Sequence, residues 1–107
     1  MQNDPGYTFV SVSTAKPGRL DDLCRVASLP SERMDGKVAG LIARQVSVDR
    51  DRNAVVVWVT LDRKASLYDY LATEEGRRDH GEDEDLSEII DSFEMYDLTP
   101  VSGRLPA

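Results

Sequence analysis

The sequence contains almost no cysteine, since Cys24 is the single residue of this type among 107. One cysteine cannot form a disulfide within the chain, and Cys24 lies in an apolar pattern that predicts a small buried side chain. The opening residues, MQNDPG, lack the charged and then apolar arrangement of a secretion signal. From these two features we expect a cytoplasmic protein.

Long hydrophobic runs and positive charge are scarce as well. The longest strongly apolar run covers residues 54–61, whereas a helix that crosses a bilayer needs about 20 such residues. The chain has 13 Lys and Arg against 20 Asp and Glu, which gives a net charge of −7. Nucleic acids and anionic membranes attract positively charged proteins, so we expect neither as a partner.

Motifs for phosphate or metal binding are also missing. The chain has no Gly-rich phosphate loop, and no Ser-His-Asp or Cys-His pattern stands out. His80 is the only histidine, and its spacing from Asp79 and Glu82 matches no common set of metal ligands. We therefore expect no metal.

The hydrophobic pattern predicts one α+β domain. We expect it over residues 7–98, after a disordered lead of residues 1–6 and before a tail of residues 99–107. Runs of β-branched and aromatic residues predict four strands, at residues 7–14, 37–48, 54–61 and 93–98. Apolar residues at helical spacing predict two helices, at residues 18–29 and 63–78, and a short third helix between Leu86 and Phe93.

The borders and the order of these elements carry further information. Pro30 is expected to end the first helix, and Asp62 is expected to cap the second. The order of strand, helix, two strands, helix, short helix and strand is the ferredoxin-like, split β-α-β arrangement. In that arrangement the helices cover one face of a four-stranded antiparallel sheet and leave the other face bare.

The stretch AVVVWVTL at residues 54–61 is apolar on both faces of the predicted strand. Val57 and Leu61 lie on one face, while Val56 and Trp58 lie on the other. Because helices cover only one face, the second would be a large exposed apolar patch. We therefore expect a homodimer with a two-fold axis, in which two sheets pack face to face. A monomer whose tail covers the sheet is the weaker alternative.

Three stretches, STAKPG, MDGKVAGLIARQVSVDRDRN and VVVWVTLDRKASLYDYL, give the chain a likeness to a known family. Over roughly residues 7–98 it resembles the antibiotic biosynthesis monooxygenase family of dimeric α+β barrels. The resemblance implies intertwined dimers with a pocket between sheet and helices in each protomer. Some members of the family oxidise polycyclic phenols to quinones with O₂ and no metal or flavin, others degrade haem, and many have no known activity.

The family's functional residues do not transfer intact. A Trp that often ends the third strand of the family is replaced by Leu61, and Trp58 lies three residues earlier, on the opposite face of the strand. The haem-degrading branch has a His on its second helix, where this chain has Tyr70, and an Asn on its first strand, where Ser11 is the counterpart. These departures argue against haem degradation.

Residue chemistry and the resemblance together suggest a set of site residues. Histidine is the natural general base at neutral pH, so His80, in a charged loop, is one catalytic candidate. Tyr70 is the other, because a tyrosine hydroxyl can hold a phenolate. The substrate-binding candidates are the apolar, aromatic and hydroxyl side chains expected at the pocket, with one buried arginine: Phe9, Ser11, Ser13, Val57, Trp58, Leu61, Tyr68 and Arg44.

Several of these residues have a purely structural alternative. Trp58 can stack on a flat ligand or anchor the dimer core, and His80 can be a base or a solvated loop residue. Arg44 can bind a ligand anion or, as we favour, pair with an acid such as Asp97. Tyr68 should point inward, whereas Tyr70, two residues along the helix, could reach the edge of the pocket.

The resemblance, together with a semi-polar strand beside aliphatic ones, implies a cofactor-independent monooxygenase, with neither a metal nor an organic cofactor. Its expected substrate is an aromatic, phenolic, polyketide-like small molecule, oxidised with O₂ in secondary-metabolite biosynthesis. The alternative is a non-catalytic dimer that binds a small molecule or assists a pathway. A cyclase or isomerase on the same scaffold lies between the two, because it would keep the base and dispense with O₂.

Overall fold

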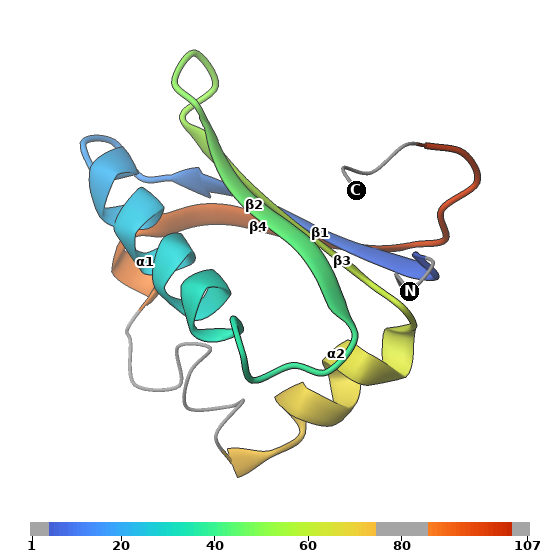
Figure 1. Cartoon of the computed structure of the whole chain (residues 1–107). Helices are drawn as coiled ribbons and strands as arrows, with labels where there is room; N and C mark the ends of the chain where they lie inside the picture. Colours follow the sequence, from blue (N-terminus) through green and yellow to red (C-terminus); the bar gives the residue numbers. More distant parts are fainter. Residues whose placement is uncertain (1–4, 75–85, 104–107) are drawn as a thin grey trace.

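The computed structural model describes residues 5–74 and 86–103 (Figure 1). Within these residues it has four strands, two α-helices and one 3-10 helix. In chain order the elements are β1 (Tyr7–Ala15), α1 (Leu20–Arg33), β2 (Leu41–Asp49), β3 (Ala54–Leu61), α2 (Lys64–Leu71), the 3-10 helix η1 (Leu86–Glu88) and β4 (Ile90–Leu98).

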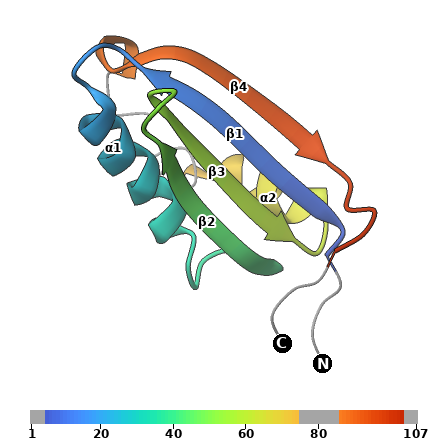
Figure 2. The same cartoon turned by 90° about the horizontal axis from the view of Figure 1, so that it is seen from above.

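The strands form one antiparallel sheet in the order β2-β3-β1-β4. Helices α1 and α2 lie on the same side of this curved sheet (Figures 1 and 2). The order and the layers confirm the predicted α+β, ferredoxin-like fold. No helix in the described part of the chain combines the length and the apolarity needed to cross a bilayer.

Strand alternation gives the sheet two different faces. The helix-facing side takes the odd-numbered residues of β1 and β3, since Ser11 lies opposite Val57 and Ser13 opposite Val55. The other side, which we call the bare face, takes the alternate residues of each strand. Its larger apolar members are Val10, Val12, Val56, Trp58, Tyr96 and Leu98. The two apolar faces of β3 thus belong to the core and to the bare face.

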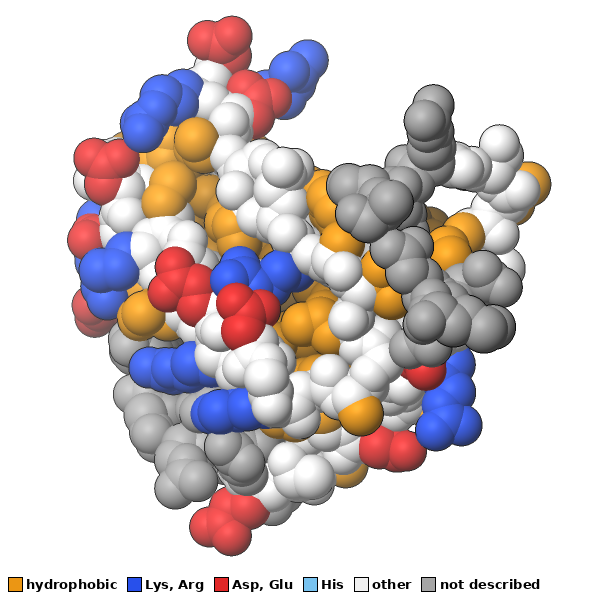
Figure 3. All heavy atoms as spheres, in the orientation of Figure 1, with side chains coloured by type: hydrophobic (Ala, Val, Ile, Leu, Met, Phe, Trp, Pro, Cys, Tyr) orange, Lys and Arg blue, Asp and Glu red, His pale blue; other side chains and the backbone are white. Residues whose placement is uncertain are grey.

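Two hydrophobic clusters fill the space between the sheet and the helices. One joins the end of β3 to α2 and includes Leu61, which is fully buried, together with Leu67 and Met34. The other packs α1 against the sheet through Leu23 and Val55. No charged side chain of the described residues is buried. Acidic and basic groups gather at the tip of the β2–β3 hairpin (Figure 3).

The first helix does not end at Pro30, as the sequence suggested. Helix α1 includes Pro30 and continues to Arg33. Proline removes one intrahelical hydrogen bond, to the carbonyl four residues earlier, but it does not forbid another turn. Packing supplies the reason to continue, because Ser31 and Met34 are both buried. The second strand begins later than predicted, at Leu41, after a connector that contains Gly36 and Gly40 at positive φ.

The predicted third helix between Leu86 and Phe93 is mostly wrong. Only η1 is helical there, and β4 begins at Ile90 and pairs with β1, with Phe93 opposite Ser13. Pairing with β1 along the whole strand outweighs the helical spacing of a few apolar residues. The cap of α2 also differs from the prediction, since the cap position is Arg63 and Asp62 instead accepts a 2.6 Å hydrogen bond from the Ser66 hydroxyl.

Candidate functional site

A cavity of about 320 Å³ lies between the helix-facing side of the sheet and the two helices. We call it the inner cavity. Its wall is mostly apolar, and its polar side chains are those of Ser11, Ser13, Ser31 and Tyr68. The volume is at the lower end of the range for small-molecule sites. The inner cavity brings together five of the residues predicted from the sequence: Phe9, Ser11, Ser13, Val57 and Tyr68.

Ser11 and Ser13 form a polar strip on the wall that β1 contributes. Their side chains share one face of the strand, about 7 Å apart along it, and they are 6% and 5% exposed. Neither hydroxyl has a hydrogen-bond partner among the described residues. Among these residues, every side-chain nitrogen or oxygen that is fully enclosed does have a partner, so the two serine hydroxyls are not fully enclosed. Both hydroxyls therefore open into the inner cavity, where a ligand or water can satisfy them.

A cluster of two tyrosines and one aspartate lies at one end of the inner cavity. The hydroxyls of Tyr7 and Tyr68 donate to the same oxygen of Asp97, Oδ1, at 2.5 Å and 2.8 Å. The Lys64 ammonium lies 3.7 Å from Oδ2 of Asp97 and 5.4 Å from the centre of the Tyr68 ring. Three elements therefore meet at this carboxylate: β1, α2 and β4.

The cluster changes the pKa values of Asp97 and Tyr7. Hydrogen bonds from Tyr7 and Tyr68, with the nearby charge of Lys64, lower the pKa of Asp97 below its ordinary value. Burial and the contact with the Asp97 carboxylate raise the pKa of Tyr7 far above that of an ordinary tyrosine. At neutral pH Asp97 is therefore an ionised carboxylate, and it accepts hydrogen bonds from both tyrosine hydroxyls.

The sequence prediction missed Tyr7 and assigned Asp97 a different partner. The alternation of side chains along each strand already indicates that both residues point to the helix-facing side. Tyr7 shares the face of Phe9 and Ser11, and Asp97 shares the face of Met95. What could not be read from either strand alone was their pairing, because 90 residues separate Tyr7 from Asp97.

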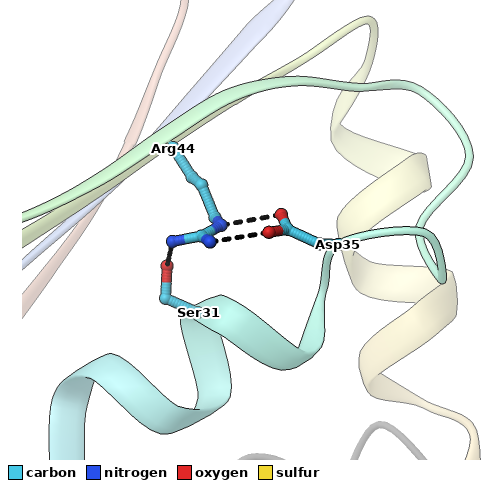
Figure 4. A network of polar contacts seen from close by, with 3 residues as sticks. All are labelled: Ser31, Asp35 and Arg44. Carbon is cyan, nitrogen blue, oxygen red and sulfur yellow. Dashed lines mark hydrogen bonds and ion pairs between the residues drawn. The ribbon is translucent and has the colours of Figure 1, made fainter. Parts of the chain in front are cut away.

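Arg44 is paired, as we favoured, but with Asp35 and not with Asp97. Its guanidinium donates to both carboxylate oxygens of Asp35, at 2.7 Å and 2.6 Å, and lies 3.4 Å from the Ser31 hydroxyl (Figure 4). Asp97 cannot be reached because β2 and β4 are the two opposite edges of the sheet. Arg44 does not line the inner cavity, and its bonds lower the pKa of Asp35.

Three other predicted residues lie elsewhere, and a fourth is not described. Trp58 is on the bare face, as its odd offset from Leu61 predicted, and its indole N–H donates to Gln45 at 3.1 Å. Leu61 and Tyr70 are buried in the core and do not line the inner cavity. The inward position of Tyr68 is confirmed, whereas Tyr70 packs into the core and does not reach the cavity edge. His80 lies outside the described residues.

No group of three or more His, Cys, Asp or Glu side chains that could hold a metal ion occurs within residues 5–74 and 86–103. The polar side-chain groups that line the inner cavity are hydroxyls, and the Asp97 carboxylate is bonded to one of them, that of Tyr68. Such groups can orient a small molecule by hydrogen bonds and hold it against apolar walls.

No protein-family model matches the chain, and no curated protein matches it. Its fold is nevertheless found in many solved structures. A protein from Pseudomonas aeruginosa superposes with a TM-score of 0.75 at 17% identity, over 95% of this chain and 100% of that one. A protein from Shewanella oneidensis gives 0.70 at 22% identity, over 92% and 93% of the two chains.

Several similar structures are named as candidate antibiotic biosynthesis monooxygenases. The one from Bacteroides thetaiotaomicron has a TM-score of 0.74 at 17% identity and covers 99% of each chain. Proteins named in the same way come from Chloroflexus aurantiacus, Bacillus cereus and Deinococcus radiodurans. These likenesses support the resemblance stated from the sequence, and at such identities what they establish for this chain is its fold.

Proposed function

We propose that this chain is a cofactor-independent monooxygenase of the antibiotic biosynthesis monooxygenase type. Its substrate would be a flat, phenolic small molecule of the kind found in secondary metabolism, bound in the inner cavity and oxidised with O₂. The fold shared with candidate monooxygenases supports the reaction type. The observation that carries the proposal is the apolar inner cavity with the two unpartnered hydroxyls of Ser11 and Ser13.

The reaction needs no external electron source. When an activated methylene carbon becomes a carbonyl, it loses two hydrogens and four electrons. One oxygen atom of O₂ enters the substrate, and the other leaves as water with those two hydrogens. The protein has to remove a proton from the phenol or enol, hold the resulting anion and keep the reacting centre dry.

The described residues fit the binding and desolvation parts of this task. Phe9 and Val57 supply apolar walls, while Ser11 and Ser13 can hydrogen-bond the oxygens of a substrate. Tyr68 contributes a further hydroxyl at the end of the inner cavity. We keep His80 as the proposed base, and this assignment rests on the sequence alone. The proposal also keeps the expected cytoplasmic location.

The test is O₂ uptake by the purified protein, in the presence of a chelator, with a panel of anthrones, naphthols and hydroquinones. We expect uptake that resists the chelator and a product that has gained one oxygen atom. A Ser11→Ala, Ser13→Ala double variant should lose about tenfold in kcat/KM, the effect of one or two lost hydrogen bonds. Ser47→Ala, on the exposed edge strand β2, is the matched control and should leave kcat/KM unchanged.

The second candidate is a binding or accessory protein, or an isomerase, that uses the same inner cavity without O₂. The position of Tyr70 favours it, because this proposed catalytic residue does not line the cavity. If no compound causes O₂ uptake but one of them raises the melting temperature, the oxygenase proposal is wrong and this second candidate replaces it. His80→Ala then separates an isomerase, which would lose turnover, from a pure binder.

A further inference from the structure

The cluster at the end of the inner cavity has its hydrogen-bond directions fixed. Each tyrosine hydroxyl has one proton, and Tyr7 and Tyr68 both give theirs to Oδ1 of Asp97. An ionised carboxylate has only acceptor sites, and the bonds from the two tyrosines lower the pKa of Asp97, so it stays ionised at neutral pH. The Tyr68 oxygen therefore keeps only acceptor capacity for any further partner.

The cluster is placed where a ligand can meet it. Tyr68 itself lines the inner cavity, and so do the two residues that flank Asp97 on the helix-facing side. These are Phe9, directly opposite Asp97 on β1, and Met95, two residues earlier on β4. Tyr7 is buried in the core behind the cluster, with 3% of its surface exposed, so Tyr68 is the hydroxyl that faces a ligand.

The carboxylate is held by more than the two tyrosines. Lys64 lies 3.7 Å from its second oxygen and is a donor, but its side chain is 60% exposed and points its charge to solvent as well. The side chain of Asp97 is 42% exposed. Asp97 and Lys64 are thus partly open to solvent, and Tyr68 is the member of the cluster that lines the inner cavity.

We propose that Asp97 is a positioning residue that holds the Tyr68 hydroxyl as an acceptor, so that the inner cavity selects ligands with an O–H or N–H donor at this end. Phenols, enols and aromatic amines meet this requirement, whereas ketones, quinones and ethers do not. The inference rests on the proposed function only in taking the inner cavity as the ligand site, and it requires no oxidation.

An acceptor at Tyr68 would also affect turnover. A hydroxyl that becomes a carbonyl during oxidation loses the proton that it gave to Tyr68. The Tyr68 oxygen, which can only accept, then faces the new carbonyl oxygen of the ligand, which can also only accept. The lone pairs of the two oxygens repel each other, and this favours dissociation of the oxidised ligand. The same contact would thus hold the reduced ligand and release the oxidised one.

The test is binding of three bicyclic probes at pH 7 under nitrogen, measured by isothermal titration calorimetry. The probes are 1-naphthol, which has a donor, 1-fluoronaphthalene, which has none and is no larger, and 1-tetralone, which has only an acceptor. The wild-type protein should bind 1-naphthol about tenfold more tightly than either of the others, the effect of one well-made hydrogen bond.

Three variants separate the inference from a general structural role. Tyr68→Phe should remove the advantage of 1-naphthol and leave the affinity for 1-fluoronaphthalene unchanged. Asp97→Asn should reduce that advantage and raise the affinity for 1-tetralone severalfold, because the new amide can donate to Tyr68 and free its hydroxyl proton. Tyr96→Phe is the matched control, since the Tyr96 hydroxyl also donates to a carboxylate on β4, that of Glu94, but belongs to the bare face. It should behave as wild type.

Equal wild-type affinity for 1-naphthol and 1-fluoronaphthalene would overturn the inference, and so would an advantage that survives in Tyr68→Phe. Failure of all three probes to bind would overturn it too, because the inner cavity would then not be a site for bicyclic ligands. Circular dichroism melts confirm that each variant is folded. Because the assay excludes O₂, a positive result together with absent O₂ uptake would reject the oxygenase alone.

Discussion

The ion pair between Arg44 and Asp35 links the start of the α1–β2 connector to the edge strand β2. It is a bidentate contact with N–O distances of 2.7 Å and 2.6 Å, the geometry in which arginine and carboxylate interact most strongly. Asp35 is exposed on its other side, so water screens the pair. Its contribution to stability should therefore be measurable but small, and it should depend on pH.

The bonds to Arg44 lower the pKa of Asp35 in the folded protein below its ordinary value of 3.8. A depressed folded pKa adds stability above the unfolded pKa, and this stability is lost as pH falls through the folded pKa. Asp35→Asn should thus lower the urea midpoint at pH 7, and the difference from wild type should shrink below pH of about 4. Asp51→Asn, in the exposed β2–β3 turn, is the control. A difference that stays constant from pH 7 to acid would contradict this assignment.

At the same scale, strand periodicity was enough to predict which side chains share a face. It placed Ser11, Ser13 and Val57 toward one side and Trp58 toward the other, and the structure agrees. It could not predict which distant side chains meet, because that depends on strand order and on where each strand ends. Arg44 pairs with Asp35 in the nearby α1–β2 connector, whereas Asp97 accepts a hydrogen bond from Tyr7 on the neighbouring strand β1.

Among the elements, the connector between α1 and β2 requires a glycine at position 40, because of its backbone conformation and its close packing. Gly40 has φ of +90°, and a Cβ there would lie 2.2 Å from Oδ1 of Asp62 and 2.8 Å from the Ser66 hydroxyl. Its carbonyl accepts a 2.9 Å hydrogen bond from the Asp62 N–H. The connector therefore packs closely on the segment that leads from β3 into α2.

Gly40→Ala should destabilise the protein by about 3 kcal/mol, since it adds a steric clash to the strain of a positive φ. Gly36→Ala is the matched control. Gly36 also has a positive φ, of +76°, but a Cβ there would meet nothing within 4 Å, so we expect a loss of about 1 kcal/mol. Urea unfolding of the two variants measures both values. Equal losses would mean that the close approach to Asp62 contributes nothing.

The elements that the sequence predicted well are those with a strong local pattern, such as β1 and β3. The errors fall where tertiary contacts outweigh local signals. Helix α1 continues past Pro30 because the next turn buries Ser31 and Met34. Strand β4 begins at Ile90 because β1 offers a free edge along its length, although the apolar spacing there is helical. A single sequence does not contain the information about these partners.

At the scale of the whole molecule, the bare face is an apolar surface of the sheet that neither helix covers. Val12 and Val56 lie opposite each other near its centre, and Tyr96 and Leu98 on β4 are 42% and 44% exposed. The tail does not take over this role in its described part, because residues 99–103 are exposed throughout and Val101 is 96% exposed. An apolar surface of this kind is typical of an interface. We therefore keep the proposal of a homodimer whose sheets pack face to face.

Light scattering on the eluting protein should accordingly give twice the 11.9 kDa mass of one chain. Val56→Asp places a charge at the centre of the bare face and should yield a folded monomer, because an unpaired charge in an apolar interface is strongly unfavourable. Val48→Asp is the matched control. Val48 is 41% exposed but lies on the helix-facing side of edge strand β2, so the dimer should persist. A wild-type monomer, or a dimer that survives Val56→Asp, would contradict the proposal. The inner cavity lies on the helix-facing side of the sheet, away from this interface, so the Val56→Asp monomer should still bind 1-naphthol with the wild-type preference.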